Sequence, residues 1–203
     1  MRYVLPVILL ALLAPAAHAY PQLPQPVPPV KGNPANRLLD VPIEATIYDA
    51  ATQCRHRRNA GITKLAAWLG AHTLGLFWGS YRCEKWGSHR ASLHAENRAI
   101  DWHLDASDKT DRRAADKLIR LLLAPDKAGN PQALARRMGV EELIWDCGYW
   151  GAGMPAFRPY SVCYRPNGKM RKRLDRTAAH RDHIHIGMTK AGAKARTSFW
   201  TAR

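Results

Sequence analysis

The sequence predicts an α+β fold in which a small antiparallel sheet is flanked by helices. Amphipathic helical segments and short strand-like segments alternate along the chain, with no internal repeat and no glycine-rich phosphate-binding loop. The chain has 203 residues, a length that suits one well-cored domain rather than two. We expect this domain to occupy residues 41–203, after a leader at 1–19 and a linker at 20–40.

The expected leader is typical of a secretory signal peptide. Arg2 precedes an apolar run at 4–13, and the small-x-small triplet Ala-His-Ala at 17–19 predicts cleavage after it. No other stretch holds the roughly 20 apolar residues that a membrane span needs. The mature chain is therefore expected to lack a transmembrane segment and to be secreted or periplasmic. Residues 20–40 are rich in proline and predict an extended, polyproline-like linker.

Three segments are predicted to be helical. Residues 62–76 are compatible with a helix, and residues 110–123 carry apolar side chains at the i, i+3, i+4 spacing of one buried stripe. A third, shorter helix is marked by Asn130 as its N-cap, Pro131 in its first turn and Gly139 just beyond its end.

Three segments are predicted to be strands. Residues 140–145 and 183–188 read as strands, with polar and apolar side chains alternating in the second, and residues 99–102 form a shorter candidate. The glycines and prolines between 148 and 168 indicate a long loop. Long loops in small domains tend to be functional or pinned to the rest of the fold.

The chain contains four cysteines. In an exported protein an even number of cysteines favours disulfides over free thiols, and four allow three connectivities. We favour Cys54 with Cys83 and Cys147 with Cys163, because each pair closes a moderate loop on one side of the histidine motifs described below. A cysteine-ligated zinc site is disfavoured, since no C-x-x-C pair occurs.

The formal charge of the chain is +15, and basic residues cluster at 55–58 (RHRR) and 169–173 (KMRKR). Such a surface attracts polyanions. Outside a cell, the partners that fit are peptidoglycan, other anionic wall polymers and nucleic acid. The alternative is a solvated basic face that only keeps the protein soluble. Charge alone does not choose among these, and it indicates no oligomeric state.

Two histidine motifs carry the chemistry of the sequence. The segment SLHAENRAID, residues 92–101, places His94 seven positions before Asp101, and HRDHIH, residues 180–185, supplies three more histidines. On a strand, the last two of these histidines project from one face, about 6.6 Å apart along the chain. Two histidines and one carboxylate can hold Zn²⁺ and leave its fourth position open for water.

These residues resemble the superfamily named after lysostaphin, the D-Ala-D-Ala carboxypeptidases and sonic hedgehog. Its carboxypeptidase branch carries S-x-H-x-x-G-x-A-x-D, followed much later by H-x-H. The matching positions are Ser92, His94, Ala99 and Asp101, and Asn97 stands where the pattern has glycine. The resemblance implies a hedgehog/DD-peptidase-like fold with zinc ligands at His94, Asp101 and His185.

The second motif, HRDHIH, is similar to the H-x-D-H-x-H of the penicillin-insensitive murein endopeptidases. This resemblance implies catalytic roles for His183 and His180. Arg98 and Arg181 flank the motif histidines and could hold a substrate carboxylate through paired hydrogen bonds, and Ser92 is a third candidate for substrate binding. Simple surface positions are the alternative for both arginines.

The resemblance implies an exported zinc peptidase of cell-wall peptides, either a D,D-carboxypeptidase or a D,D-endopeptidase, that uses a metal-activated water. One alternative is a wall-binding module that keeps the metal without cutting peptide. Another is a secreted metal-dependent nuclease, but the helix asparagine of the common ββα-metal signature is not convincingly present. Nucleic acid is therefore the less favoured partner.

Overall fold

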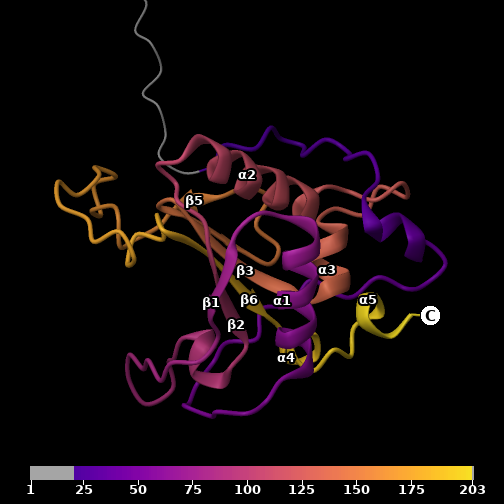
Figure 1. The fold of residues 1–203 in the computed structure, drawn as a ribbon, viewed down its shortest axis with the longest axis horizontal. Helices are drawn as coiled ribbons and strands as arrows, with labels where there is room; N and C mark the ends of the chain where they lie inside the picture. The colour runs from indigo at the N-terminus through magenta and orange to yellow at the C-terminus, as the bar shows by residue number, and fades with distance from the viewer. Residues whose placement is uncertain (1–20, 203) are drawn as a thin grey trace, which may run out of the picture.

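A six-stranded antiparallel sheet forms the centre of the described chain, residues 21–202, in the computed structural model (Figure 1). The strands lie in the order β1-β2-β6-β3-β4-β5. Their bounds are Leu76–Gly79 (β1), Ala99–His103 (β2), Val140–Trp145 (β3), Gly148–Gly151 (β4), Arg158–Pro159 (β5) and His183–Met188 (β6). The predicted α+β class with an antiparallel sheet is confirmed. The three predicted strands, β2, β3 and β6, lie next to one another in the middle of the sheet.

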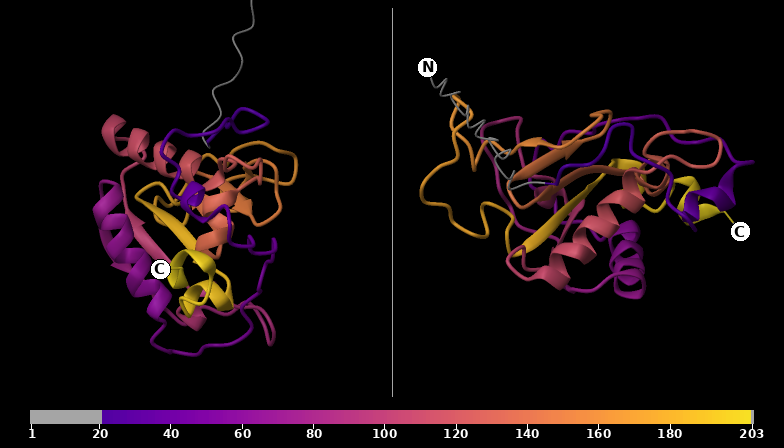
Figure 2. Two further views of the ribbon diagram at one scale, coloured as in Figure 1. Left: turned by 90° about the vertical axis from the view of Figure 1, so that its right-hand side faces the viewer. Right: turned by 90° about the horizontal axis from the view of Figure 1, so that it is seen from above.

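Helices cover one face of this sheet (Figure 2). The bounds of the helices are Ala60–His72 (α1), Lys109–Leu123 (α2), Ala133–Met138 (α3), Lys190–Ala193 (α4) and Ser198–Thr201 (α5). Two 3-10 helices are Pro34–Leu38 (η1) and Leu93–Glu96 (η2). No helix within residues 21–202 combines the length and the apolar character that crossing a bilayer requires.

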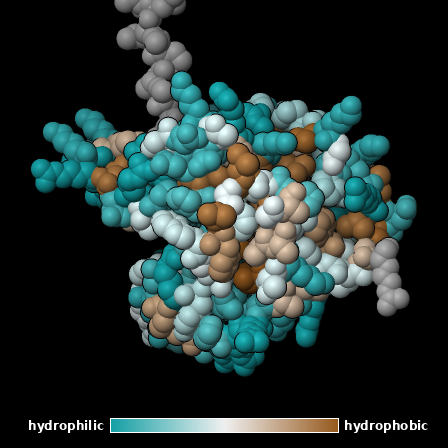
Figure 3. Space-filling view, in the orientation of Figure 1, coloured by the Kyte–Doolittle hydropathy of each residue, from teal (hydrophilic) through white to brown (hydrophobic). Residues whose placement is uncertain are grey.

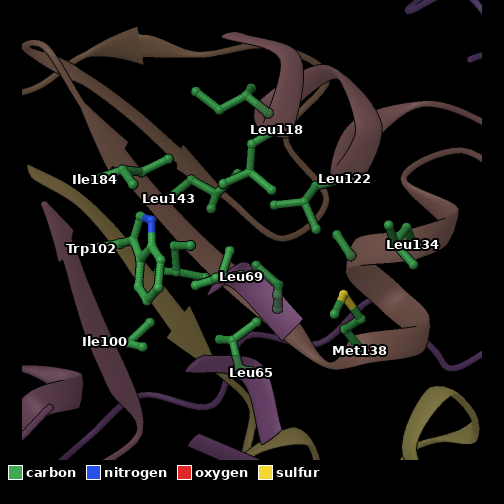
Figure 4. Close-up of a cluster of buried hydrophobic side chains, with 14 of the residues drawn as sticks. Leu65, Leu69, Ile100, Trp102, Leu118, Leu122, Leu134, Met138, Leu143 and Ile184 are labelled. Carbon is green, nitrogen blue, oxygen red and sulfur yellow. The ribbon is translucent and has the colours of Figure 1, made fainter. Parts of the chain in front are cut away.

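The hydrophobic core lies between the sheet and helices α1, α2 and α3 (Figure 4). The helices contribute buried side chains that include Leu65, Leu69, Leu118, Leu122, Leu134 and Met138. The sheet contributes Ile100, Trp102, Leu143 and Ile184. Since side chains alternate between the two faces of a strand, packing one face of the sheet against helices leaves the other face available for polar side chains.

The predicted helices are confirmed, but two of their boundaries differ. Helix α1 ends at His72, because the chain then turns into β1, which the sequence did not predict. Helix α3 begins only at Ala133, so the predictions of Asn130 as its N-cap and of Pro131 in its first turn were wrong. The side chain of Asn130 instead donates to the carboxylate of Asp126. Gly139 ends α3 as predicted, with a φ of 75°.

Part of the predicted linker at 20–40 is folded. Residues Pro34–Leu38 form η1, and Asn33 and Ala35 are buried. The Asn36 side chain accepts a hydrogen bond from the backbone of Lys127, so this segment packs onto the connection between α2 and α3. The extended conformation predicted for the linker was therefore wrong for 33–38. The predicted signal peptide at 1–19 lies outside the described residues.

Both predicted disulfides are present, Cys54–Cys83 and Cys147–Cys163, and no cysteine is free. The second disulfide encloses a stretch of the predicted loop at 148–168, which also contributes β4 and β5 to the edge of the sheet. The loop is thus held both by a covalent bond and by strand pairing.

Arg98 lies directly before β2 and is 3% exposed. Its guanidinium donates to Glu141 Oε1 at 2.8 Å, to Glu96 Oε2 at 3.0 Å and to the Met188 carbonyl at 2.7 Å, and it also contacts the Asp49 carbonyl. These bonds tie η2, β3, β6 and the N-terminal segment together. The Arg98 side chain, which the sequence suggested for substrate binding, therefore holds parts of the fold together.

We predict that Glu141→Ala lowers the free energy of unfolding by about 3 kcal/mol, because it removes a fully buried partner of the Arg98 charge. Denaturant or thermal unfolding measures this change. The control is Arg176→Ala, which breaks an exposed pair with Asp105 and should cost less than about 1 kcal/mol. Equal stability of the two variants would contradict a structural role for the buried pair.

Candidate metal centre

Three ligand-type side chains converge on the sheet face that the helices do not cover. His94 comes from η2, Asp101 from β2 and His185 from β6, and all three are buried. His94 Nε2 lies 3.0 Å from Asp101 Oδ1 and 3.0 Å from His185 Nδ1, and His185 Nδ1 lies 3.3 Å from Asp101 Oδ1. This group could hold a metal ion. The structure thus brings together the three residues that the motifs implied.

Strand register places two of the three ligands. Asp101 on β2 lies directly opposite His185 on β6, and His103 lies opposite His183. Directly opposed residues in an antiparallel pair project from the same face of the sheet. The intervening residues, Trp102 and Ile184 among them, point into the core. Alternation therefore separates a polar metal face from an apolar helix face along the same two strands.

The third ligand depends on the close approach of η2 to β6. The Ser92 side chain accepts a hydrogen bond from the His94 backbone and caps η2. Leu93 packs against Gly187, where an added Cβ would lie 2.3 Å from Leu93 Cδ1. The absence of a side chain at Gly187 is what allows η2 to bring His94 over the strand pair.

Asn97, which replaces the glycine of the family pattern, keeps the turn that follows η2. Its backbone is left-handed, with a φ of 51°, and asparagine is one of the few non-glycine residues that adopt this conformation readily. Its side chain donates to the Arg57 carbonyl at 2.6 Å. Asn97 therefore forms this turn and also tethers it to the segment that contains Arg57.

Neighbouring groups orient the two ligand imidazoles. His94 Nδ1 lies 3.0 Å from the Ser80 carbonyl, which can only accept, so Nδ1 carries the proton and Nε2 faces the cluster with its lone pair. His185 presents Nδ1 to the cluster, while its Nε2 lies 3.1 Å from Glu142 Oε1. Glu142 also accepts a hydrogen bond from the Tyr48 hydroxyl at 2.7 Å. A carboxylate behind a histidine ligand is the usual support of a metal site.

The spacing of the donor atoms fits a small tetrahedral ion. An ion held at about 2.0–2.1 Å keeps its ligand atoms about 3.3–3.4 Å apart. The separations here are 3.0 to 3.3 Å. Two imidazole nitrogens and one carboxylate oxygen therefore define one face of a tetrahedron.

The electrostatics of the group favour a positive charge at its centre. Burial alone would raise the pKa of Asp101, but the hydrogen bond with His185 holds it well below its usual range. Burial also acts to lower the pKa of His185, yet the carboxylates of Asp101 and Glu142 raise it to about 9. Burial lowers the pKa of His94. A metal ion bound at this group would take the place of a proton on His185.

The two further histidines of HRDHIH lie beside the group. His183 Nδ1 lies 2.8 Å from Asp182 Oδ1, and its Nε2 lies 3.5 Å from Asp101 Oδ1 without a hydrogen-bond partner among the described residues. The His180 ring centroid is 4.6 Å from that of His183 and 5.7 Å from that of His185. Burial lowers the pKa of both His183 and His180. The resulting neutral imidazoles can accept protons.

The group opens into a cleft of about 800 Å³. One wall is formed by residues 82–86 and the other by Tyr160, Val162 and residues 175–178, with His180 and His185 on the floor. The hollow on the left of the space-filling view lies between these two segments (Figure 3). A ligand in this cleft would reach the metal group from solvent.

The three residues predicted to bind substrate, Ser92, Arg98 and Arg181, do not belong to the metal group. Ser92 lines the cleft, but its hydroxyl caps η2. Arg181 is not a cleft-lining residue, and its guanidinium pairs with Asp146 at 3.1 Å. Arg98 is buried in the ion-pair network described above. Of these candidates, only Ser92 lies in the wall of the cleft.

Two functional residues were missed by sequence reasoning. Arg82 lines the cleft and donates to the Asp101 carboxylate, and no spacing in the sequence indicates this contact. Glu142 lies behind His185 and could have been found, because it occupies an alternate position of a predicted strand. His103, by contrast, has a structural contact, since its Nδ1 lies 2.7 Å from the Asp182 carbonyl.

Comparisons of the chain with models of known protein families, with curated proteins and with solved structures gave no match. The function of the site is therefore interpreted from its own geometry and from the motifs of the sequence.

We predict that alanine at His94, Asp101 or His185 removes most of the metal affinity, because each residue supplies one of only three protein ligands. Elemental analysis after dialysis against zinc measures the metal content. His89→Ala, at an exposed position, is the control and should keep about one metal ion per chain. Full metal content in any of the three variants would remove that residue from the ligand set.

A second variant tests the approach of η2. Gly187→Ala should weaken metal binding about 10- to 100-fold, because the new methyl group forces Leu93, and with it His94, away from β6. Competition against a chromophoric chelator measures the affinity. Gly79→Ala is the matched control, since its Cβ would meet no atom within 4 Å. Unchanged affinity in both variants would show that this contact does not position His94.

Proposed function

We propose that the protein is an exported zinc peptidase that hydrolyses bacterial cell-wall peptides, as a D,D-carboxypeptidase or a D,D-endopeptidase. One observation carries the proposal, namely that a buried two-histidine, one-carboxylate group lies at an open cleft beside two further neutral histidines. The likeness of SLHAENRAID and HRDHIH to the motifs of zinc wall peptidases supports it independently.

Zinc is the metal that suits this donor set best. Imidazole nitrogen with carboxylate oxygen in a tetrahedral arrangement is typical of zinc, and three protein ligands with one open direction are typical of a catalytic rather than a structural site. Zinc bound here would act as a Lewis acid and would lower the pKa of a water in its open position to about 7.

We infer that His183 moves a proton at the reacting centre. Its Nδ1 is held by Asp182, whose other carboxylate oxygen accepts a hydrogen bond from the Thr177 hydroxyl at 2.6 Å. This contact fixes the ring, so that Nε2 faces the metal group. Because burial lowers its pKa, His183 is neutral near pH 7 and can accept a proton. His180 packs against its ring and supports that position.

The cleft wall supports recognition of a peptide that carries a carboxylate. The side chain of Arg82 is 44% exposed, and its guanidinium reaches both Asp101 and Glu84. It therefore lies between the metal group and solvent, where a substrate carboxylate can approach it. Lys85 lines the same wall and adds a second positive charge. Wall peptides carry free carboxylates, which fits this wall.

The two disulfides support export. Disulfides persist in oxidising compartments such as the periplasm or the extracellular space, and all four cysteines are paired. Together with the leader expected at 1–19, this favours a secreted or periplasmic protein that meets peptidoglycan directly.

We predict that His183→Ala folds and retains zinc but loses about 10²- to 10⁴-fold in hydrolysis, the usual contribution of a general acid or base. His180→Ala should show a smaller loss, because its ring acts through His183. Mass spectrometry of peptides released from purified sacculi measures the activity. His89→Ala, exposed and outside the cleft, is the control.

Other outcomes would redirect the proposal. Loss of zinc in His183→Ala with retention in His185→Ala would reverse the ligand assignment. A zinc-loaded wild type that binds sacculi without releasing peptides would indicate a non-catalytic wall-binding module. Cleavage of plasmid DNA instead of sacculi would indicate a nuclease.

A further inference from the structure

The basic segment at 55–58 is a feature that the metal cleft does not use. Its backbone is held rigidly against the turn that follows η2. Arg55 N donates to the Ala95 carbonyl at 2.6 Å, and the Arg57 carbonyl accepts from the Asn97 side chain at 2.6 Å. The Cys54–Cys83 disulfide fixes the start of the segment. Its side chains are therefore presented from an ordered backbone.

This segment forms one wall of a second, smaller cavity of about 270 Å³. Helix α4 forms the opposite wall, and the segment and the helix meet along the lower edge of the view in Figure 1. Four of the lining residues carry exposed, positively charged side chains, namely Arg55, Arg57, Lys190 and Lys194. The lining also includes the Glu96–Arg98 pair.

The four positive side chains have no direct hydrogen-bonded partner within the described chain, although the Glu96 carboxylate interacts electrostatically with Lys190. Across residues 21–202, none of their side chains makes an ion pair or a hydrogen bond. The one carboxylate in the lining, Glu96, is already bonded to Arg98 at 3.0 Å. Like charges gathered around one cavity repel one another, and a bound anion relieves that repulsion.

We propose that this cavity binds a phosphate group of a phosphodiester polymer that carries no bases, such as a polyol phosphate. Arginine presents a planar fork of donors that matches phosphate oxygens, and lysine adds a mobile point charge. The cavity is smaller than the roughly 300–1,000 Å³ of most small-molecule sites, which suits a compact anion. A polymer adds neighbouring phosphates that can reach the other basic residues of the 55–58 segment.

The lining favours such a polymer over nucleic acid. Proteins that hold single strands stack the bases on aromatic side chains, and no aromatic residue lines this cavity. The cavity is also distinct from the metal cleft, because no described residue lines both. The 92–98 turn contributes Ser92 and Leu93 to the cleft and Glu96 and Arg98 to the cavity. Binding at the cavity would hold the protein on an anionic wall and leave the cleft free. The inference therefore stands whether or not the cleft hydrolyses peptide.

The test measures direct binding of a labelled poly(glycerol phosphate) to the mature protein. Fluorescence anisotropy of the label reports the binding at about 0.1 M salt, where the Debye length is about 10 Å. The Arg55→Ala/Arg57→Ala variant should bind at least about tenfold more weakly, since it loses two charge-assisted contacts. Lys190→Ala/Lys194→Ala should show a comparable loss, and it keeps the test decisive if the arginine variant fails to fold.

The matched control is Arg171→Ala/Arg173→Ala, which removes the same charge from the second basic cluster. That cluster lies in the long loop between β5 and β6, far from α4 in Figure 1. The control should bind the polymer within about twofold of wild type, because charges beyond the Debye length are screened. Equal losses in both double variants would overturn the proposal and leave only an effect of net charge.

Two further probes separate the chemistry of the ligand. Single-stranded DNA with the same number of phosphates and poly-glutamate should both bind more weakly than the polyol phosphate. For both probes, Arg55→Ala/Arg57→Ala should weaken binding no more than the control variant Arg171→Ala/Arg173→Ala does. Tight DNA binding with that sensitivity would overturn the proposal in favour of a nucleic-acid site. The same result with poly-glutamate would overturn it in favour of a carboxylate site.

Discussion

The buried charge of Asp101, at the middle of the strand pair β2–β6, is the constraint on which the rest of the site depends. A carboxylate that is 5% exposed cannot rely on water for solvation, and an uncompensated charge in such a place is strongly unfavourable. His185 and Arg82 direct donors toward it, and the lone pair of His94 Nε2 faces the same point. The resulting group could hold a cation.

The metal group in turn determines what the surrounding backbone must do. His94 can reach Asp101 only if η2 lies directly on β6, and this requires glycine at 187 and a left-handed residue at 97. The buried network of Arg98 anchors the same turn from the other side. The turn at 92–98 therefore forms a wall between the metal cleft and the basic cavity. Polymer bound in the cavity would contact the turn that presents His94.

The three central strands could be predicted from the sequence because their side chains alternate between the two faces of the sheet. Strands β2, β3 and β6 each place one face against helices, and the ligand spacing follows from the same alternation. The edges of the sheet were missed because β1, β4 and β5 are two to four residues long and their pairing depends on tertiary contacts.

Asn130 was misread as a helix cap because Asp126, four residues earlier, competes for its side chain. Arg98 and Arg181 have ion-pair partners distant in sequence, which local spacing cannot show.

Whether such a centre is structural or catalytic depends on its fourth ligand. A structural zinc site is closed by a fourth protein side chain, whereas a catalytic one keeps that position open. Among the other histidines, His183 brings its Nε2 to 3.5 Å from Asp101 Oδ1. It does not belong to the group whose ligand atoms all lie within 4.8 Å of one another, and Asp182 holds its ring from behind. One of the three ligands, His185, lines the cleft of about 800 Å³. A buried imidazole nitrogen that has no hydrogen-bond partner among the described residues can accept a proton, and that is the role we propose for His183.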